Sequence, residues 1–553
     1  MQRAGFLETA YRGFLDAGIF EKFPVHVDRT KVGELVAAYE ALLQQFSPQE
    51  IEALGRVPDE MMRKMGEVGL FGFSIAREYG GLGFNLWEYL EVIRELARRD
   101  LSVALVSIAH LSIGVKGIQL FGTEEQKAKY LPLAASGDMI FSYALTEPHI
   151  GSDAKHIQTT AVLSDDETHY ILNGRKTYIT NANYAGGLTV FAQLDPEKPG
   201  HMGAFIVETD WEGVQIGKDM PKMGLTASST AAIHFKDVKV PRENLLGKPG
   251  DGFKIAMTIL NFGRLGLGAA STGLMEQSVA DMTKRARNRI QFGVPIENFE
   301  LIQEKIVRAR AHAFACDAMT TLTAAFLEED PFRNVAMETS HVKLFGTTRA
   351  WDVLYDALQT AGGSGYIKTN PYEKRMRDFR VTTIFEGTTE IHSIYPPLFA
   401  IRRMTKEMGR AGSPLKSLQV FWKNLTGGLR WDFPFQDKQF KCAARQAKRN
   451  ARFLKFALLA VPMTYRKNVM AKEYVLRRLT TLSLYTYAIL AMLARMQKDL
   501  DRGLLSTEHR LLLDYMLQEM KERRRSCLRL WNTRKERLAT RIFRWIRKEG
   551  LED

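Results

Sequence analysis

The spacing of apolar residues changes twice along this chain, and each spacing predicts a different kind of element. Through residues 30–140 apolar positions recur every three to four residues, as in 32–46 and 87–99, which predicts helices. From near residue 141 apolar and polar residues alternate instead, which predicts strands at 159–163, 169–172, 176–179, 189–194, 204–208 and 231–235. The Asn173-Gly174 pair, between the second and third of these strands, predicts a hairpin.

Helical spacing returns from residue 253 to about residue 403. The segment 260–282 is rich in Gly and Ala on one side, which lets helices approach closely. The predicted fold class is mainly α with a central β domain. We expect an N-terminal helical domain, a middle β domain, a helical bundle, a linker and a basic helical extension, at 1–140, 141–245, 246–405, 406–434 and 435–553.

The composition is that of a folded soluble protein, with 25% charged and 45% hydrophobic residues among 553. The longest uncharged stretch, 479–494, would span about 24 Å as a helix, short of the roughly 30 Å of a bilayer core, which favours a buried helix. The three cysteines form no CxxC or Cys/His cluster, so no metal site is expected. Residues 1–28 have the pattern of neither a signal nor a transit peptide. We therefore expect the cytoplasm, or the mitochondrial matrix if the chain is a processed form.

Two neighbouring segments at the start of the β domain carry candidate chemistry. The run from Tyr143 to Asp153 contains Thr-Glu-Pro and Gly-Ser-Asp, whose Pro and Gly interrupt the strand. Taken alone, it is equally well a turn capped by Ser and Asp. The run Lys-Thr-Tyr-Ile-Thr-Asn at 176–181 adds a second strand with an aromatic and hydroxyls. Together the two can supply an aromatic wall and hydrogen-bond donors for a flat heterocycle.

Three later segments add a possible phosphate site and a carboxylate. Arg-Ile-Gln-Phe-Gly stands at 289–293, and a Gly-rich run at 359–366 has the backbone N–H groups to hold a pyrophosphate. In Ile-Phe-Glu-Gly-Thr-Thr-Glu-Ile, at 384–391, Glu386 lies between an aromatic residue and a glycine. Taken alone, this setting favours a glutamate that caps a helix over a catalytic carboxylate.

In order and spacing these segments resemble the acyl-CoA dehydrogenase family over roughly residues 50–403. Met223-Gly224, Ser228-Ser229-Thr230 and Val240-Pro241 fit its pattern too. Within the family, the run 254–264 and the long helical extension look most like the very-long-chain type. The resemblance implies FAD as cofactor and oxidation of acyl-CoA between Cα and Cβ, with the electrons passing to an electron-transfer flavoprotein.

The resemblance also implies a role for individual residues. Glu386 matches the base that removes the α-proton. The family's other placement of the base, just before Arg264, is filled here by Gly263. Expected substrate contacts are Ser152, Asn261, Arg264, Glu386 and Gly387. Expected cofactor contacts are Tyr143, Leu145, Thr146, Tyr178, Ile179, Thr180, Gly387, Thr388 and Glu390, with Arg289, Gln291, Phe292, Gln359, Gly362 and Gly363 reaching FAD of a neighbouring subunit, which implies a homodimer.

Three questions stay open from the sequence. The stretch 101–115 has no formal charge beyond His110, which fits a deep tunnel for a long acyl chain or an ordinary core helix. An acyl-CoA oxidase, which uses oxygen, shares the scaffold. An assembly or scaffold protein that retains a dehydrogenase body is the alternative from another class.

The charge of the chain is unevenly placed. From residue 401 onward there are 35 Lys and Arg against 14 Asp and Glu, whereas the first 400 residues carry 42 against 49. A basic stripe follows helical spacing at Lys441, Arg445, Lys448, Arg449, Arg452 and Lys455. A helix of this kind can lie on an anionic membrane, through 438–478, or be a solvated face of a bundle. A second basic cluster at 523–548 can bind membrane or a protein partner, and no nucleic-acid module accompanies either.

Overall fold

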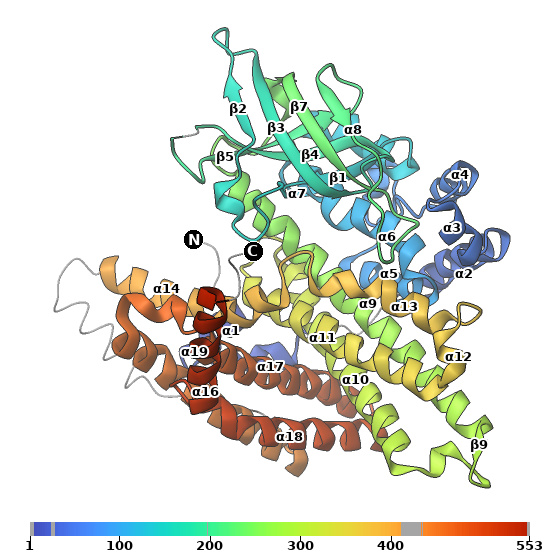
Figure 1. The fold of residues 1–553 in the computed structure, drawn as a ribbon, viewed down its shortest axis with the longest axis vertical. Coiled ribbons are helices and arrows are strands. Elements are labelled where there is room, and N and C mark those ends of the chain that lie inside the picture. The colour runs from blue at the N-terminus through green and yellow to red at the C-terminus, as the bar shows by residue number, and fades with distance from the viewer. Residues whose placement is uncertain (1–4, 24–27, 196, 411–432, 434, 550–553) are drawn as a thin grey trace. The chain divides into compact units, whose positions relative to one another are not determined.

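A computed structural model of the chain describes residues 5–23, 28–195, 197–410, 433 and 435–549 (Figure 1). These residues form two compact units. The larger unit comprises Pro24–Phe332 and Phe345–Thr388, and the smaller unit comprises Met1–Phe23, Arg333–Leu344 and Thr389–Asp553. The helix α11 (Ala336–Ala361) contributes residues to both.

The larger unit begins with a set of helices, two of which have capping boxes at their N-termini. Asn85 and Glu88 form a capping box at the start of α5, and Thr123 and Gln126 form one at the start of α8. The helices are α2 (Arg29–Gln45), α3 (Pro48–Leu54), α4 (Asp59–Glu67), α5 (Leu86–Arg99), α6 (Leu101–Ala109), α7 (Lys116–Phe121) and α8 (Glu124–Ser136), with one π-helical turn at His110–Gly114.

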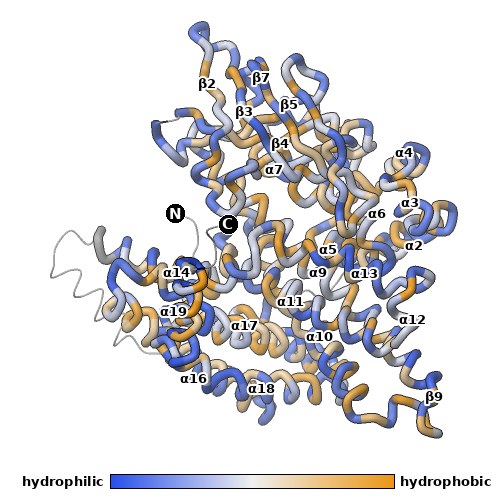
Figure 2. Tube along the Cα trace, viewed as in Figure 1, coloured by the Kyte–Doolittle hydropathy of each residue, from blue (hydrophilic) through white to orange (hydrophobic). Residues whose placement is uncertain are grey.

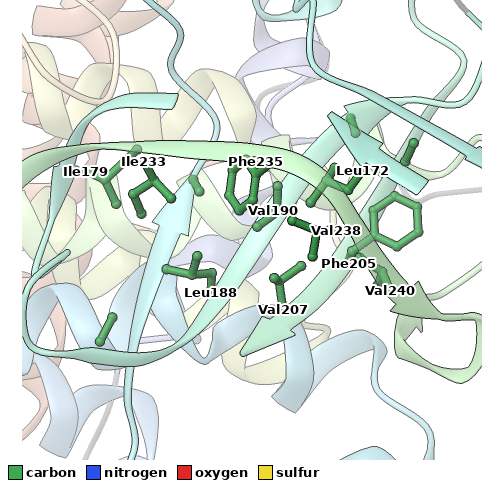
Figure 3. Packing of buried hydrophobic residues seen from close by; sticks show 14 of the residues in the cluster. Leu172, Ile179, Leu188, Val190, Phe205, Val207, Ile233, Phe235, Val238 and Val240 are labelled. Atoms are coloured by element: carbon green, nitrogen blue, oxygen red, sulfur yellow. The ribbon is translucent and has the colours of Figure 1, made fainter. Parts of the chain in front are cut away.

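The middle of the larger unit is a mostly antiparallel sheet of order β6-β7-β3-β2-β4-β5-β8, on which β1 pairs in parallel with β4. Apolar residues of β3, β4, β5 and β7 fill its core; Figure 3 shows Leu188, Val190 and Val207 with Ile233 and Phe235 among them. The strands are β1 (Ile140–Ala144), β2 (Thr160–Leu163), β3 (His169–Thr180), β4 (Ala185–Gln193), β5 (Met202–Glu208), β6 (Val214–Ile216), β7 (Thr230–Pro241) and β8 (Leu245–Leu246).

The hairpin predicted at Asn173-Gly174 is wrong. The strand β3 runs unbroken through both residues, and its pairing with β7 shifts register between Leu172 and Gly174. Gly174 has a φ of 146°, and a β-carbon there would lie 2.8 Å from Cα of Thr159. The glycine is therefore needed for a bulge and a close approach of backbone, not for a turn.

The last part of the larger unit is built on two long helices, α9 (Gly252–Asn288) and α10 (Glu300–Glu329). The predicted close packing of the Gly- and Ala-rich segment is confirmed: a β-carbon on Gly273 of α9 would lie 2.1 Å from the carbonyl oxygen of Arg94 on α5. Arg94 also pairs with Glu276 on α9 at 2.7 Å. The remaining elements are β9 (Ile290–Gln291), β10 (Val294–Pro295), α12 (Gly363–Tyr366) and α13 (Pro371–Phe379).

The smaller unit is helical, and α17 is its core. Figure 2 shows the apolar residues along α17, nearly all of which are buried. Two segments, Leu101–Phe121 and Glu473–Asp501, have the length and composition of a membrane span, but 94% and 89% of their apolar windows are buried within the protein, which is typical of core helices. The helices of this unit are α1 (Phe6–Tyr11), α14 (Thr389–Arg410), α16 (Lys438–Tyr465), α17 (Glu473–Asp501), α18 (Thr507–Cys527) and α19 (Arg534–Glu549).

The predicted fold class, mainly α with a central β domain, is confirmed. Most of the predicted linker, residues 406–434, lies outside the described residues.

Candidate active site

Glu386 occupies a left-handed turn. A short 3-10 turn ends at Thr383 and α14 begins at Thr389. Between them Glu386 has a φ of 55° and Gly387 a φ of 101°. Left-handed backbone at a residue other than glycine costs on the order of 1–3 kcal/mol and clusters at functional sites. Because the residue before α14 is Thr388, Glu386 is not the N-cap of that helix.

The carboxylate of Glu386 lies against the backbone of α9. A β-carbon built on Gly263 would lie 2.5 Å from Oε1 of Glu386 and 2.8 Å from its Oε2. The next residue of α9, Arg264, donates a hydrogen bond of 3.3 Å from Nε to the backbone oxygen of Glu386. A side chain at position 263 and the carboxylate of Glu386 therefore compete for the same space, and the glycine leaves that space to Glu386.

Two tyrosines share the electrostatic environment of Glu386. Burial raises the pKa of Tyr143, which Arg264 in part opposes and Glu386 reinforces. Burial also raises the pKa of Tyr89, and the charge of Glu386 adds to that effect. The hydroxyl of Tyr143 donates to the carbonyl of Ala256 on α9 at 3.3 Å. Both phenols therefore stay neutral near pH 7 beside the carboxylate.

The two segments expected to flank a flat heterocycle lie side by side. The N–H of Thr177 donates to the carbonyl of Thr146 at 2.9 Å, and the hydroxyl of Ser142 donates to the carbonyl of Thr180 at 2.8 Å. Tyr178 lies in a register shift of β3, with a φ of 56° and an exposed fraction of 66%. Leu145 and Ile179 are buried next to these positions. An exposed ring at a bulge beside half-buried hydroxyls is suited to stacking on a planar ligand.

A buried ion pair, which the sequence analysis did not single out, holds this wall together. Nζ of Lys176 lies 2.8 Å from Oε1 of Glu147, and both side chains are almost fully buried. Glu147 also accepts hydrogen bonds from the N–H groups of Gln158 and Thr159, at 2.6 and 2.9 Å. Burial opposes ionisation of Glu147, but Lys176 and these donors outweigh it and lower its pKa. The signal was the glutamate of Thr-Glu-Pro followed by a lysine within an apolar strand.

The remaining residues predicted to contact substrate or the flavin are placed as follows. Asn261 is buried on α9, one turn before Arg264 and on the same side of that helix. Ser152 is exposed in the loop after β1, Thr388 is half-buried, and Glu390 is exposed in the first turn of α14.

The residues predicted to reach a neighbouring subunit's cofactor gather at two exposed turns. Phe292, at the tip of the β9–β10 hairpin, is 95% exposed. Arg285, at the end of α9, donates to the carbonyl of Ala361, at the end of α11, at 3.1 Å, which ties the two turns to each other. The other five residues of the set are exposed as well, at Arg289, Gln291, Gln359, Gly362 and Gly363.

These turns have the donor set of a phosphate site. Gly362 has a φ of 65° and a ψ of −144°, a conformation open essentially only to glycine. A β-carbon on Gly362 or Gly363 would meet nothing within 4 Å, so a ligand can approach this backbone closely, while the N–H of Gly362 itself donates to the carbonyl of Gln359 at 3.1 Å. An open glycine backbone, a guanidinium and an exposed phenyl ring fit the pyrophosphate and adenine of a dinucleotide. Together with the wall around Tyr178, they fit FAD.

Comparison with known proteins agrees with this geometry. Family models of the N-terminal, middle and C-terminal domains of acyl-CoA dehydrogenases match residues 35–138, 142–238 and 250–394. The mitochondrial very long-chain specific acyl-CoA dehydrogenase of Rattus norvegicus is 32% identical over 547 residues, which is 94% of this chain and 83% of the relative.

Solved structures agree as well. The acyl-CoA dehydrogenase of Bacillus anthracis, complexed with FAD, superposes with a TM-score of 0.80 at 28% identity and covers 95% of this chain and 93% of its own. A structure described as the electron transferring flavoprotein of Acidaminococcus fermentans has a TM-score of 0.61 at 34% identity, over 68% of this chain and 98% of its own.

Fold, site and comparisons together define an FAD-dependent oxidoreductase. The chain belongs to the acyl-CoA dehydrogenase family, and relatives that match most of its length include mitochondrial very long-chain specific members.

Proposed function

We propose that this protein dehydrogenates long-chain fatty acyl-CoA to trans-2-enoyl-CoA, the first step of fatty-acid β-oxidation, with Glu386 as the base. The observation that carries the proposal is that the Glu386 carboxylate lies against Gly263. Arg264 in addition donates a hydrogen bond to the backbone carbonyl of Glu386. A carboxylate fixed in this way, on a left-handed turn, is held in position before substrate arrives.

The chemistry divides between the cofactor and the residues around it. FAD, when bound, accepts the β-hydrogen of the acyl chain as hydride. Glu386 removes the α-proton at a carboxylate oxygen, and its own N–H helps to hold the thioester oxygen, where negative charge develops. The hydrogen bond from Arg264 to the carbonyl of Glu386 fixes the backbone directly after the N–H and carboxylate of this residue.

The test is replacement of Glu386 by Gln, which keeps the shape and removes the base. We expect the rate of flavin bleaching by acyl-CoA under anaerobic conditions to fall by about 10²–10⁴-fold, with FAD retained. Glu300→Gln, an exposed carboxylate at the start of α10, is the matched control and should behave as wild type. Bleaching at a near-normal rate in Glu386→Gln would reject the assignment.

The preference for long chains is supported by the apolar stretch 101–115. Leu105 and Ala109 on α6 are buried, and the continuous segment to Phe121 is strongly apolar. Relatives that span most of this chain include very long-chain specific enzymes. Anaerobic titration with acyl-CoAs of graded length tests the preference, and an optimum at short chains would contradict it.

An electron-transfer flavoprotein is the proposed electron acceptor, supported by the family and by the likeness to the structure described as an electron transferring flavoprotein. An oxidase would instead pass the electrons to oxygen. Hydrogen peroxide formed in proportion to enoyl-CoA during aerobic turnover would favour the oxidase.

A homodimer is proposed because the residues expected to hold the adenosine diphosphate of FAD are exposed at two turns of a single chain. A second copy that supplied its cofactor there would use them. A monomer that retains FAD at sub-micromolar concentration, measured by sedimentation, would argue against this arrangement.

The site of action proposed is the cytoplasm, at the inner face of the cell membrane, or the mitochondrial matrix if the chain is a processed form. The segment 438–478 supports a peripheral association, because Lys441, Arg445, Arg449 and Arg452 are exposed along α16. Each basic residue near an anionic surface contributes on the order of 1 kcal/mol. The apolar side of α16, including Ala444, Ala447, Ala451 and Leu454, is buried. The basic residues of α16 can therefore attract the protein to an anionic membrane, but its buried apolar side cannot insert into the bilayer.

A further inference from the structure

The helix α19 (Arg534–Glu549) has an apolar side that nothing among the described residues covers. Leu538, Ile542 and Ile546 are 45%, 55% and 46% exposed, and Phe543 and Trp545 are 61% and 64% exposed. At 100° per residue these five side chains occupy an arc of about 160°. Figure 2 shows hydrophilic and hydrophobic residues following each other along α19.

The opposite side of α19 is strongly basic. Six of its Lys and Arg residues fall within an arc of about 140° that does not overlap the apolar arc. They are Arg534, Arg537, Arg541, Arg544, Arg547 and Lys548. Lys535, in the first turn, is the basic residue of this helix that lies within the apolar arc. The helix thus has two distinct faces, one apolar and one cationic.

The start of α19 is fixed, whereas its body is open. Thr533 and Glu536 form reciprocal hydrogen bonds at the first turn, and Glu536 pairs with the largely buried Arg478 of α17. Arg478 also donates to the carbonyl of Trp531 at 3.1 Å. From Arg537 to Lys548 every residue is exposed. An isolated helix of this length gains little stability unless its apolar side is packed. We therefore expect the apolar side of α19 to be covered by a binding partner.

We propose that α19 is a membrane-surface helix, which inserts Ile542, Phe543 and Ile546 at the headgroup boundary of an anionic bilayer while its arginines contact lipid phosphates. Charge complementarity selects this occupant. A face of isoleucine, phenylalanine and tryptophan beside a row of arginines matches the interface of an anionic bilayer, which has an apolar interior and a negatively charged surface.

The inference deepens the proposed membrane association and assigns insertion to a different element from α16. Exposed apolar residues near α16 are few, with Phe456 and Met463 on one side of the helix and Met470 in the turn after it, whereas α19 exposes five on one side. Two functions can then act together: α16 attracts the protein to the surface and α19 anchors it.

The test is co-sedimentation of the full-length, FAD-loaded protein with phosphatidylcholine vesicles, with and without phosphatidylglycerol. We expect binding only to vesicles that contain phosphatidylglycerol. The double variant Ile542→Asp/Ile546→Asp should lower the partition coefficient by at least about tenfold, because a charge on the apolar side opposes insertion. Leu511→Asp is the matched control, since Leu511 is a 65% exposed leucine on another helix of the same unit, α18, and should bind as wild type.

Each other outcome decides between the proposals. If Arg445→Glu/Arg449→Glu on α16 abolishes binding and the α19 variant binds normally, the assignment of α19 is overturned and that of α16 stands. If wild type stays in the supernatant and the α19 variant changes the oligomeric state, the apolar side covers a second copy of the chain and the membrane proposal fails. Turnover of soluble acyl-CoA, measured on the same samples, reports on the dehydrogenase function separately.

Discussion

Gly263 and the carboxylate of Glu386 occupy adjoining space, so close that a single β-carbon on Gly263 would lie 2.5 Å from Oε1. Oxygen and carbon do not approach to that distance without a bond, so either the carboxylate or α9 would have to move. Gly263 lies within a buried stretch of α9, between residues packed on several sides, so the helix has little freedom to shift.

Gly263→Ala should therefore displace the carboxylate of Glu386, the proposed base, rather than the helix. We expect kcat for acyl-CoA to fall by about 10²-fold, because a displacement of the order of 1 Å is enough to lose productive geometry. FAD content should stay as in wild type. Gly33→Ala makes the same change on α2, where a β-carbon meets nothing within 4 Å, and should leave kcat unchanged. Full activity in Gly263→Ala would mean that Glu386 adopts another position in the working enzyme.

Glu147→Gln tests the buried Glu147–Lys176 ion pair, which joins the segment after β1 to β3. The substitution leaves the ammonium of Lys176 buried without its carboxylate, which should lower the free energy of unfolding by about 3–5 kcal/mol. Asp195→Asn breaks a solvent-exposed pair with Lys198, at 2.7 Å, and should lower the free energy of unfolding far less, because water screens the two charges. Urea denaturation of both variants gives the comparison, and equal losses would show that burial of the Glu147–Lys176 pair has no special weight.

Arg289→Ala tests whether the β9–β10 hairpin holds cofactor. Loss of one charge-assisted hydrogen bond to a phosphate should weaken FAD binding by about 10–100-fold. The absorbance of the purified protein at 450 nm relative to 280 nm measures the retained flavin. Arg287→Ala, two residues earlier and 70% exposed, is the control. If both variants keep their flavin, the hairpin is not a cofactor contact.

Replacing Lys116 by Met should change how the free energy of unfolding depends on pH. The ammonium of Lys116 lies 5.2 Å from the ring centroid of Phe262 and 5.7 Å from that of Tyr89, and no ion pair among the described residues includes it. Burial lowers the pKa of Lys116 from 10.5 to about 8. Below pH 8 this shift corresponds to a cost of roughly 3 kcal/mol for keeping the ammonium charged in the folded protein. Methionine fills a similar volume without a charge, so the variant should be more stable than wild type below pH 8.

The sign of the pH effect follows from proton binding. Between pH 8 and 10.5 the unfolded chain still carries the proton on Lys116 and the folded chain does not, so wild-type stability rises with pH relative to Lys116→Met. The difference in free energy of unfolding between Lys116→Met and wild type should narrow or reverse across that range. A gap that stays constant with pH would show that Lys116 titrates normally in the folded protein.

Much of the local structure could be predicted because short-range physics determines it. Apolar periodicity located α2 and α5 to within one to three residues at each end. The run of Gly and Ala in α9 predicted a close approach of another helix, and the structure shows that helix to be α5. The hairpin at Asn173-Gly174 failed because the same two residues also suit a bulge, and the choice between turn and bulge depends on whether a partner strand, here β7, continues alongside.

Some features of the candidate site could likewise be predicted from the sequence, and others could not. The sequence by itself determined the family, through motifs whose order and spacing cover some 350 residues, and it singled out Glu386 and the vacancy at Gly263. That the vacancy and the carboxylate share one space was decided only by the tertiary structure, which brings a turn near residue 386 onto α9. The Glu147–Lys176 pair and the open side of α19 were decided there too. Burial and exposure depend on which elements pack together, and two basic amphipathic helices, α16 and α19, look alike until packing covers the apolar side of one and leaves the other exposed.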